Sequence, residues 1–154
     1  MKNERLLQLA KLANKHDQFS NEIRTAAVAV TATEMQFRPF PHRCVEYAYV
    51  LCMLLFKQDV SFVSVGISQI SIRHYRSQFG FSQFQALFHS MSAQKNLLLC
   101  CKLLESSNMN TLDKMREVYN GKSTFFYKRA LRKNHELLVK LEALRETHRE
   151  RASI

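Results

Sequence analysis

The sequence predicts a single, mainly α-helical domain. Its 154 residues include only three glycines and two prolines, which leaves few residues for the tight turns of an all-β fold. Apolar residues make up 46% of the chain and charged residues 23%, as in ordinary globular proteins, and this length suits one hydrophobic core. Apolar residues recur at helical spacing almost everywhere, so we expect helices and at most a short β-hairpin or extended segment near 60–72.

The first two predicted helices span about 2–16 and 21–35. Leucine and alanine supply the apolar side of the first, and Ser20 is a good N-cap for the second. The apolar stripe of the second helix follows a three- and four-residue spacing: Ile23, Ala26, Ala27, Val30. The next position along this stripe is Glu34, so a carboxyl group stands where the periodicity predicts an apolar residue.

The third predicted helix, 43–57, follows the segment FRPFP at 37–41, which ends the second helix because a residue before proline avoids the helical region. This third helix is apolar on nearly all sides, so we predict that it is the central, fully buried helix. It is shorter than the roughly 18 apolar residues of a membrane span and contains Glu46. We expect no transmembrane segment.

The segment FVSVGISQIS at 62–71 alternates apolar and polar residues, which favours a short strand or extended turn. Ile67, Ile70 and Tyr75 fit equally well a helix that starts at Gly66. Beyond it we predict a turn at 79–82, a loop or short helix at 84–88, and helices at 92–106, 111–119 and 124–148. Their expected N-caps are Ser92, Thr111 and Ser123.

The four cysteines have no spacing typical of a zinc site, and we predict no metal and no cofactor. Cys44 and Cys52 would lie about 12 Å apart on one helix, too far for a disulfide. Cys100 and Cys101 are neighbours on another helix and are poorly placed to pair. We expect buried free thiols, with bridges between helices as the open alternative.

The formal net charge is +10, and basic residues crowd 122–151, where glutamates are interleaved with them. Interleaved signs are typical of a solvated helix face, and an anionic partner is the alternative. The N-terminus MKNERLLQLAKLANKHD lacks the apolar run of a secretory signal. We therefore expect a cytoplasmic chain, a leader that precedes residue 1, or another export route.

Glu34 and the glycine-containing segment are the candidates for chemistry. A carboxyl group that faces the core is desolvated, which raises its pKa and suits a general acid at neutral pH. The alternative is a glutamate that leans out to water or pairs with Arg38 or Arg43. Gly66 allows a close backbone approach to a ligand or a positive φ, and Gln69 offers the donor and acceptor that sugars require. The alternative here is a tight connection into the next helix.

Five segments, read in order, resemble the lytic transglycosylase domain, which has a lysozyme-like fold: AVAVTATE, VSVGISQIS, NLLLCCKLL, VYNG and FFYKRAL. The resemblance covers about 20–132 and implies that Glu34 is the catalytic glutamate at a helix end. It leaves an N-terminal helix at 1–19 and a basic C-terminal helix extension at 133–154. The gap between Glu34 and Gly66 is similar to that of the subgroup attached to type IV secretion and conjugation machines.

The resemblance implies cleavage of the glycosidic bond between N-acetylmuramic acid and N-acetylglucosamine in peptidoglycan, with a 1,6-anhydro product, in the periplasm or cell envelope. It also implies secretion-system proteins as partners. The residues that it implies for holding the sugar are Ser64, Gly66, Ile67, Gln69, Tyr119 and Asn120. The chain departs from the pattern of the subgroup at Met35, Ser64 and Ser71.

Two alternatives stay open. The first is a degenerate glycan-binding or scaffold module of the same fold, which the three departures favour. The second is a basic helical protein that binds nucleic acid through 122–151, against which the low aromatic content of that helix counts.

Overall fold

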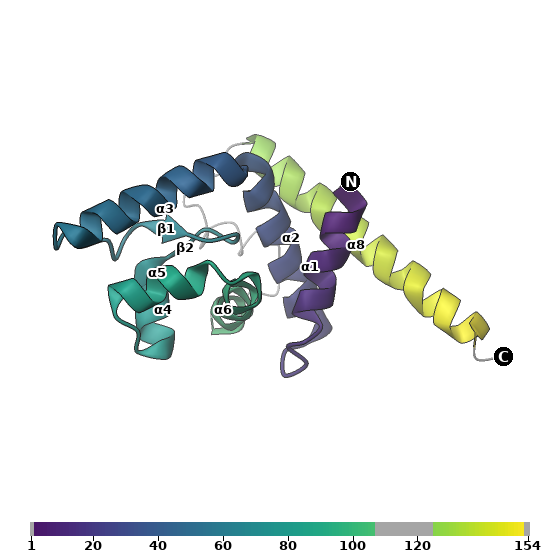
Figure 1. The fold of residues 1–154 in the computed structure, drawn as a ribbon. Coiled ribbons are helices and arrows are strands. Elements are labelled where there is room, and N and C mark those ends of the chain that lie inside the picture. Colours follow the sequence, from purple (N-terminus) through teal and green to yellow (C-terminus); the bar gives the residue numbers. More distant parts are fainter. Residues whose placement is uncertain (1, 107–124, 153–154) are drawn as a thin grey trace.

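The computed structural model describes residues 2–106 and 125–152, and within them the fold is mainly helical with one two-stranded antiparallel sheet (Figure 1). The predicted fold class is confirmed. The elements are α1 (Lys2–Ala13), α2 (Asn21–Phe37), α3 (Phe40–Leu55), β1 (Ser64–Val65), β2 (Ile70–Ser71), α4 (Ile72–Phe79), α5 (Gln83–Ser90), α6 (Ala93–Ser106) and α8 (Phe125–Ala152).

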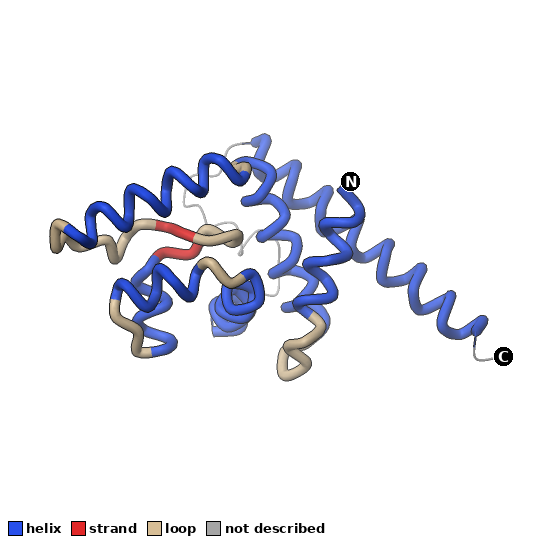
Figure 2. The backbone as a smooth tube through the Cα atoms, viewed as in Figure 1, coloured by secondary structure: helices blue, strands red, loops and turns tan. Residues whose placement is uncertain are grey.

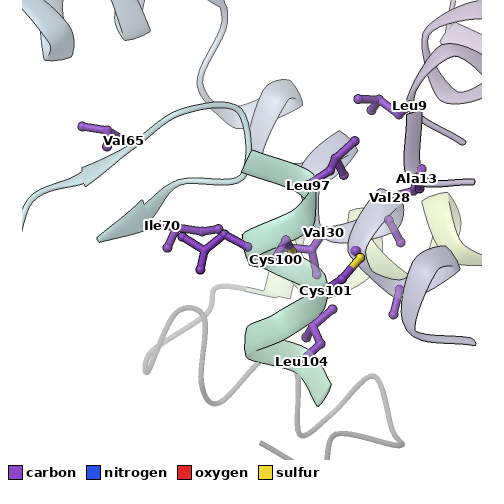
Figure 3. Packing of buried hydrophobic residues seen from close by; sticks show 14 of the residues in the cluster. Leu9, Ala13, Val28, Val30, Val65, Ile70, Leu97, Cys100, Cys101 and Leu104 are labelled. Atoms are coloured by element: carbon purple, nitrogen blue, oxygen red, sulfur yellow. The ribbon is translucent and has the colours of Figure 1, made fainter. Parts of the chain in front are cut away.

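Helix α2 is the centre of the packing, because α1, α6 and α8 all lie against it (Figure 1). Every residue from 25 to 31 is buried. The side chains of this run are small, chiefly alanine, valine and threonine, so neighbouring helices approach α2 from several directions. Leucines of α6 and α8 complete the core: Leu97 and Leu104 of α6 (Figure 3) and Leu131 and Leu138 of α8.

The ends of α2 follow the predicted signals. The Ser20 hydroxyl accepts a hydrogen bond from the backbone N–H of Ile23 at 3.3 Å, which confirms the N-cap. The helix stops at Phe37, two residues before the first proline. Pro39 is then the N-cap residue of α3, and Pro41 lies in the first turn of α3, where a missing N–H costs nothing.

Helix α3 is not the buried central helix that the sequence predicts. Only Val50 and Leu54 are buried, and the rest of the helix is half-buried or exposed. It lies along the margin of the fold above the sheet and α5 (Figure 1). Hydrophobicity on all sides is a property of the sequence alone, whereas burial requires neighbours. In the described part of the chain the neighbours surround α2 instead.

The four cysteines form two pairs, one buried on α6 and one exposed on α3. All four are free, as predicted, and Cys100 and Cys101 are buried in the core (Figure 3). Cys44 and Cys52 are exposed, because both lie on the outer side of α3. The prediction of buried thiols is therefore wrong for this second pair.

The segment 62–71 forms a hairpin rather than the start of a helix (Figure 2). Ser64 pairs with Ser71 and Val65 with Ile70, and residues 66–69 form the turn between them. Helix α4 begins directly after this hairpin at Ile72 and ends at Phe79, and its C-cap Gly80 has a φ of +68°, the left-handed conformation common at helix ends. The alternating pattern thus predicts this segment correctly.

The later elements agree with prediction where they are described. The segment 84–88 belongs to helix α5, which a capping box of Ser82 and Gln85 begins. Ser92 accepts from the N–H of Lys95 at 3.4 Å at the start of α6. Helix α8 runs antiparallel to α2 and continues to Ala152, beyond the predicted end (Figure 1). The predicted helix at 111–119, Thr111 and Ser123 lie outside the described residues.

The described helices lack the combination of length and apolar character that a membrane span requires.

Candidate functional site

Glu34 lies in the last turn of α2 and faces inward. Only 6% of its surface is exposed, and its Oε1 accepts a hydrogen bond from the hydroxyl of Tyr127 on α8 at 2.7 Å. The ring of Phe37 packs against that of Tyr127, with the centroids 5.6 Å apart. The carboxyl group is therefore enclosed between two helices, and the alternative of a glutamate that leans out to water is wrong.

Four neighbouring influences act on the pKa of Glu34. Burial is the largest, and it raises the pKa because a charged carboxylate loses its hydration. The hydrogen bond from Tyr127 and the positive charge of Arg38 lower the pKa, while the negative charge of Glu46 raises it. The net result is a pKa above the ordinary value, so the side chain holds its proton more tightly than an exposed glutamate does.

Tyr127 is suited to hold this carboxyl group in place. Burial and, after it, the charge of Glu34 raise the pKa of the Tyr127 hydroxyl far above its ordinary value. The hydroxyl thus keeps its proton and donates a hydrogen bond to the Glu34 oxygen. Helix α8, which supplies Tyr127, is itself held against α2 by the Asn134 amide, which donates to the Thr33 hydroxyl at 3.0 Å.

A second carboxyl group, Glu46, lies close enough to influence Glu34. It comes from the inner side of α3, where the guanidinium of Arg38 pairs with its Oε1 and the side-chain amide of Gln69 donates to its Oε2 at 2.9 Å. Sequence reasoning missed this residue. The available signal was that Glu46 is the only charged residue between positions 44 and 56.

Gln69 reaches the same network from the turn of the hairpin. Its side-chain N–H₂ group donates to Glu46 and, at 3.1 Å, to the backbone carbonyl of Gly66. Its side-chain oxygen is buried and, among the described residues, has no donor. Buried acceptors without a partner are rare because they cost about 1–3 kcal/mol. The oxygen of Gln69 is thus a buried acceptor whose hydrogen-bonding capacity no described group of the chain uses.

The backbone of the turn is strained in a way that fixes this side chain. Gln69 has a φ of +51° and Gly66 a φ of +87°, both in the left-handed half of conformational space that residues with a Cβ rarely adopt. A Cβ at Gly66 would lie 1.8 Å from the side-chain nitrogen of Asn96. Glycine is therefore required at this position by the packing against α6.

Asn96 and Thr31 anchor the turn to the core. The Asn96 oxygen accepts from the backbone N–H of Ser68 at 2.8 Å, and the Thr31 and Ser68 hydroxyls are 2.6 Å apart. All three residues are fully buried, so these bonds are shielded from water. They fix the turn, and with it Gln69, relative to α2 and α6. Sequence reasoning did not single out Thr31 or Ser68.

The remaining predicted residues fall into two groups. Ser64 faces Ser71 across the hairpin, and Ile67 is half-buried and packs against the core. Ser64 and Ser71, two of the departures from the family pattern, are thus one cross-strand pair. Tyr119 and Asn120 lie outside the described residues. In the described ranges no cluster of histidine, cysteine, aspartate and glutamate side chains is arranged to hold a metal ion.

Comparison with protein-family models, with curated proteins and with solved structures found no match to this chain.

Proposed function

We propose that the chain is a lytic transglycosylase that cleaves peptidoglycan between N-acetylmuramic acid and N-acetylglucosamine. The observation that supports this most is the buried Glu34 carboxyl group, whose raised pKa favours the protonated form that a general acid needs. The sequence segments that resemble this family also support Glu34, because the resemblance implies that it is the catalytic glutamate.

The proposed reaction uses Glu34 twice. Protonated Glu34 donates its proton to the glycosidic oxygen, the bond from that oxygen to the anomeric carbon of the muramic sugar breaks, and an oxocarbenium-like state forms. The Glu34 carboxylate then takes the proton of the 6-hydroxyl group of the same sugar, and the 6-oxygen attacks the anomeric carbon. The product is a 1,6-anhydro sugar, and Glu34 has regained its proton.

Glu46 has a supporting role in this scheme. Many glycosidases use two carboxyl groups, one as acid and one as base or nucleophile. Both oxygens of Glu46 are already bonded, one to Arg38 and one to Gln69. We therefore assign Glu46 to positioning Gln69 and to keeping the pKa of Glu34 high, and leave the chemical step to Glu34.

The hairpin turn is the proposed binding side of the site. The free oxygen of Gln69 would accept a hydrogen bond from a sugar hydroxyl or from the N–H of an acetamido group. Gly66, which accepts from the Gln69 side chain through its carbonyl, Ile67 and Ser64 belong to the same hairpin as Gln69. Tyr119 and Asn120 stay predicted contacts of the sugar. Such an enzyme would work in the periplasm or cell envelope and would open the wall for a type IV secretion or conjugation apparatus.

The test is product analysis on isolated peptidoglycan. We expect the protein to release 1,6-anhydromuropeptides, seen by mass spectrometry, and Glu34→Gln to release none while its circular dichroism spectrum is unchanged. Glu22→Gln is the matched control, because Glu22 lies on the same helix but is exposed. Equal product from Glu34→Gln and the parent protein would remove Glu34 from the mechanism.

A second candidate is a glycan-binding or scaffold module of the same fold. The observation that favours it is that Ser64 and Ser71, two departures from the family pattern, form one pair at the edge of the turn. Retention on peptidoglycan without any soluble product from the parent protein would favour this candidate.

A further inference from the structure

The outer side of α3 is an apolar surface without a cover among the described residues. At 100° per residue, its members fall within one half of the helix and its C-cap, and all of them are exposed: Phe40, Pro41, Cys44, Val45, Ala48, Tyr49, Leu51, Cys52, Leu55 and Phe56. We call this set the outer face of α3. Glu46 and Arg43, the charged residues of the helix, lie on the opposite side and are half-buried.

The outer face is large enough for a protein interface. Phe40, Tyr49 and Phe56 are 71%, 55% and 72% exposed. At about 150–250 Å² for an aromatic side chain, these three alone expose roughly 300–500 Å². Val45, Leu51 and Leu55 add aliphatic area to this. A typical stable interface buries about 800 Å² on each side, and exposed apolar patches beyond a few hundred Å² mark interaction sites.

We propose that two copies of the chain associate through the outer face of α3, with the two helices antiparallel and related by a two-fold axis near Ala48. The residues along the middle of the face are spaced evenly about Ala48. A two-fold axis there sets Cys44 against Cys52 of the other copy, Val45 against Leu51, and Pro41 against Leu55. Every contact in this interface joins apolar side chains, and the face complements itself as a two-fold interface requires.

The size of the side chains supports a helix as the occupant. Cys44, Ala48 and Cys52 follow each other at intervals of four and form a shallow line of small residues, with larger side chains on either side. Ridges and grooves at this spacing are the features through which helices pack at 8–10 Å between their axes. The spacing at 41, 44/45, 48, 51/52 and 55 is also that of a two-heptad seam between paired helices.

Charge argues for a second copy and against a lipid surface. Helices that lie on membranes carry lysine and arginine beside the apolar face, whereas no lysine or arginine occurs between Arg43 and Lys57. The net charge of +10 opposes self-association at most surfaces of this chain. The outer face contributes none of that charge. The proposal is independent of the proposed activity, because Glu46 and its partners lie on the other side of α3.

The first experiment measures the mass of the chain in solution, by light scattering over a range of protein concentrations with a reducing agent present. We expect a dimer, and Leu55→Glu should weaken it at least tenfold, because each interface would bury two unpaired carboxylates. Leu144→Glu on α8 is the matched control, because Leu55 and Leu144 are 68% and 59% exposed. It should leave the dimer intact. Circular dichroism checks that both variants are folded.

The second experiment tests the antiparallel register with diamide, which accepts two electrons and two protons from a pair of thiols. The parent chain should form a disulfide-linked dimer on a non-reducing gel. Cys44→Ser alone and Cys52→Ser alone should form none, whereas a mixture of these two variants should form one. Cys100 and Cys101 have no exposed surface and should not react.

Three results would overturn the proposal. The first is a monomer at every concentration. The second is a dimer that survives Leu55→Glu, or single cysteine variants that still crosslink efficiently. The third is a monomer that binds vesicles of anionic phospholipid and loses that binding with Leu55→Glu, which would assign the outer face of α3 to a membrane surface.

Discussion

The groups around Glu34 shift its pKa in opposite directions, and single substitutions can remove these groups one at a time. Burial and the charge of Glu46 raise its pKa, while Tyr127 and Arg38 lower it. A general acid works only while it is protonated, so activity is lost as the pH rises through this pKa. The alkaline limb of the pH–rate profile therefore reports on the environment of Glu34.

Glu46→Gln and Tyr127→Phe should move this limb in opposite directions. Glu46→Gln removes a negative charge and leaves Arg38 without its partner, and both changes lower the pKa of Glu34, so the limb should shift to lower pH. Tyr127→Phe removes the hydrogen bond that lowers the pKa, so the limb should shift to higher pH. The measurement is the rate of anhydromuropeptide release as a function of pH.

The shifts of the pH limb also show whether Tyr127 and Glu46 act on Glu34 or only stabilise the fold. Tyr127→Phe loses one hydrogen bond and should cost about 1 kcal/mol of stability, and loss of stability alone would lower the rate without moving the limb. Limbs that coincide in the parent protein and both variants would show that Glu34 is not the group that titrates in the reaction.

Glu34→Gln should stabilise the protein at neutral pH. Because the pKa of Glu34 is raised in the folded state above its ordinary value of 4.5, the parent protein loses stability as the pH rises from 4.5 through the folded-state pKa. The loss is about 1.4 kcal/mol for each unit by which the pKa is raised. Glutamine has no charge to bury and still accepts from Tyr127, so the variant avoids this loss.

Urea denaturation at several pH values measures this effect. The stability gained by Glu34→Gln should be largest above the folded-state pKa and should vanish below pH 4.5, where the carboxyl group is protonated in both states. Glu22→Gln, on the exposed side of the same helix, should change stability little at any pH. A gain that does not depend on pH would contradict the burial of Glu34 as a charged group.

At the scale of the elements, the turn at 66–69 depends on one glycine. Gly66→Ala should cost roughly 3 kcal/mol or more, since overpacking costs about 1–3 kcal/mol and a left-handed alanine about 1–2 kcal/mol. Gly80→Ala is the matched control, because Gly80 also has a positive φ but has open space around its Cβ position. Gly80→Ala should cost only the roughly 1–2 kcal/mol of a left-handed alanine.

Chemical denaturation followed by circular dichroism gives both values. The difference between the two variants separates the contacts of a Cβ at residue 66 with Asn96 and with the backbone oxygen of Ser90 from the strain of positive φ. Equal losses of stability would show that Asn96 moves aside without cost. We also expect Gly66→Ala to lower the rate on peptidoglycan, because Gln69 depends on the same turn for its position.

The sequence predicts the existence and order of the described helices well, and their burial less well. The clearest case is the exchange of roles between α2 and α3. Leucine, methionine and valine made α3 look central, yet small residues are what allow α2 to touch three helices. Periodicity shows which side of a helix is apolar, but α3 is apolar on nearly all sides, so its pattern does not show which side is buried. Where such a helix packs depends on contacts between distant parts of the chain, which local patterns do not contain.

Only some residues of the candidate site could be identified from the sequence. Glu34 and Gln69 could be selected because each breaks a local rule: one is a carboxyl group on an apolar stripe, the other follows a glycine in a strand-like segment. Thr31 could not, because its role comes from a contact across 37 positions of the chain. For Glu46 the sequence offered only its charge within an apolar helix, and its contact with Gln69 spans 23 positions. Gly66 has the positive φ that the sequence suggests, and the structure adds a second reason for glycine, because the side chain of Asn96 lies against it.

At the scale of the whole molecule, α8 carries a run of exposed positive charge. Helix α8 extends past α1 and α2 (Figure 1), and its exposed basic residues are Lys128, Arg129, Arg132, Lys133 and Lys140. Of the interleaved acids, Glu142 turns toward α2 and accepts from the Thr25 hydroxyl at 3.2 Å. Glu136 stays exposed among these basic residues, so the exposed side of this part of α8 carries mixed charge with an excess of positive charge. This excess favours an anionic partner, for which we propose the stem-peptide carboxylates of peptidoglycan.

Lys133→Gln combined with Lys140→Gln should weaken binding to isolated peptidoglycan. We expect a loss of roughly 2- to 30-fold at low salt, from about 0.2–1 kcal/mol for each exposed charge contact, and a smaller loss as salt is added. Lys11→Gln combined with Lys15→Gln is the matched control, since it removes the same charge from exposed positions at the other end of the chain. Sedimentation with Glu34→Gln as the background measures binding without cleavage.

Equal losses in both pairs would mean that net charge alone, rather than α8, attracts the polymer. Tight binding of duplex DNA that falls steeply with salt and is lost with the α8 pair would instead favour the nucleic-acid alternative.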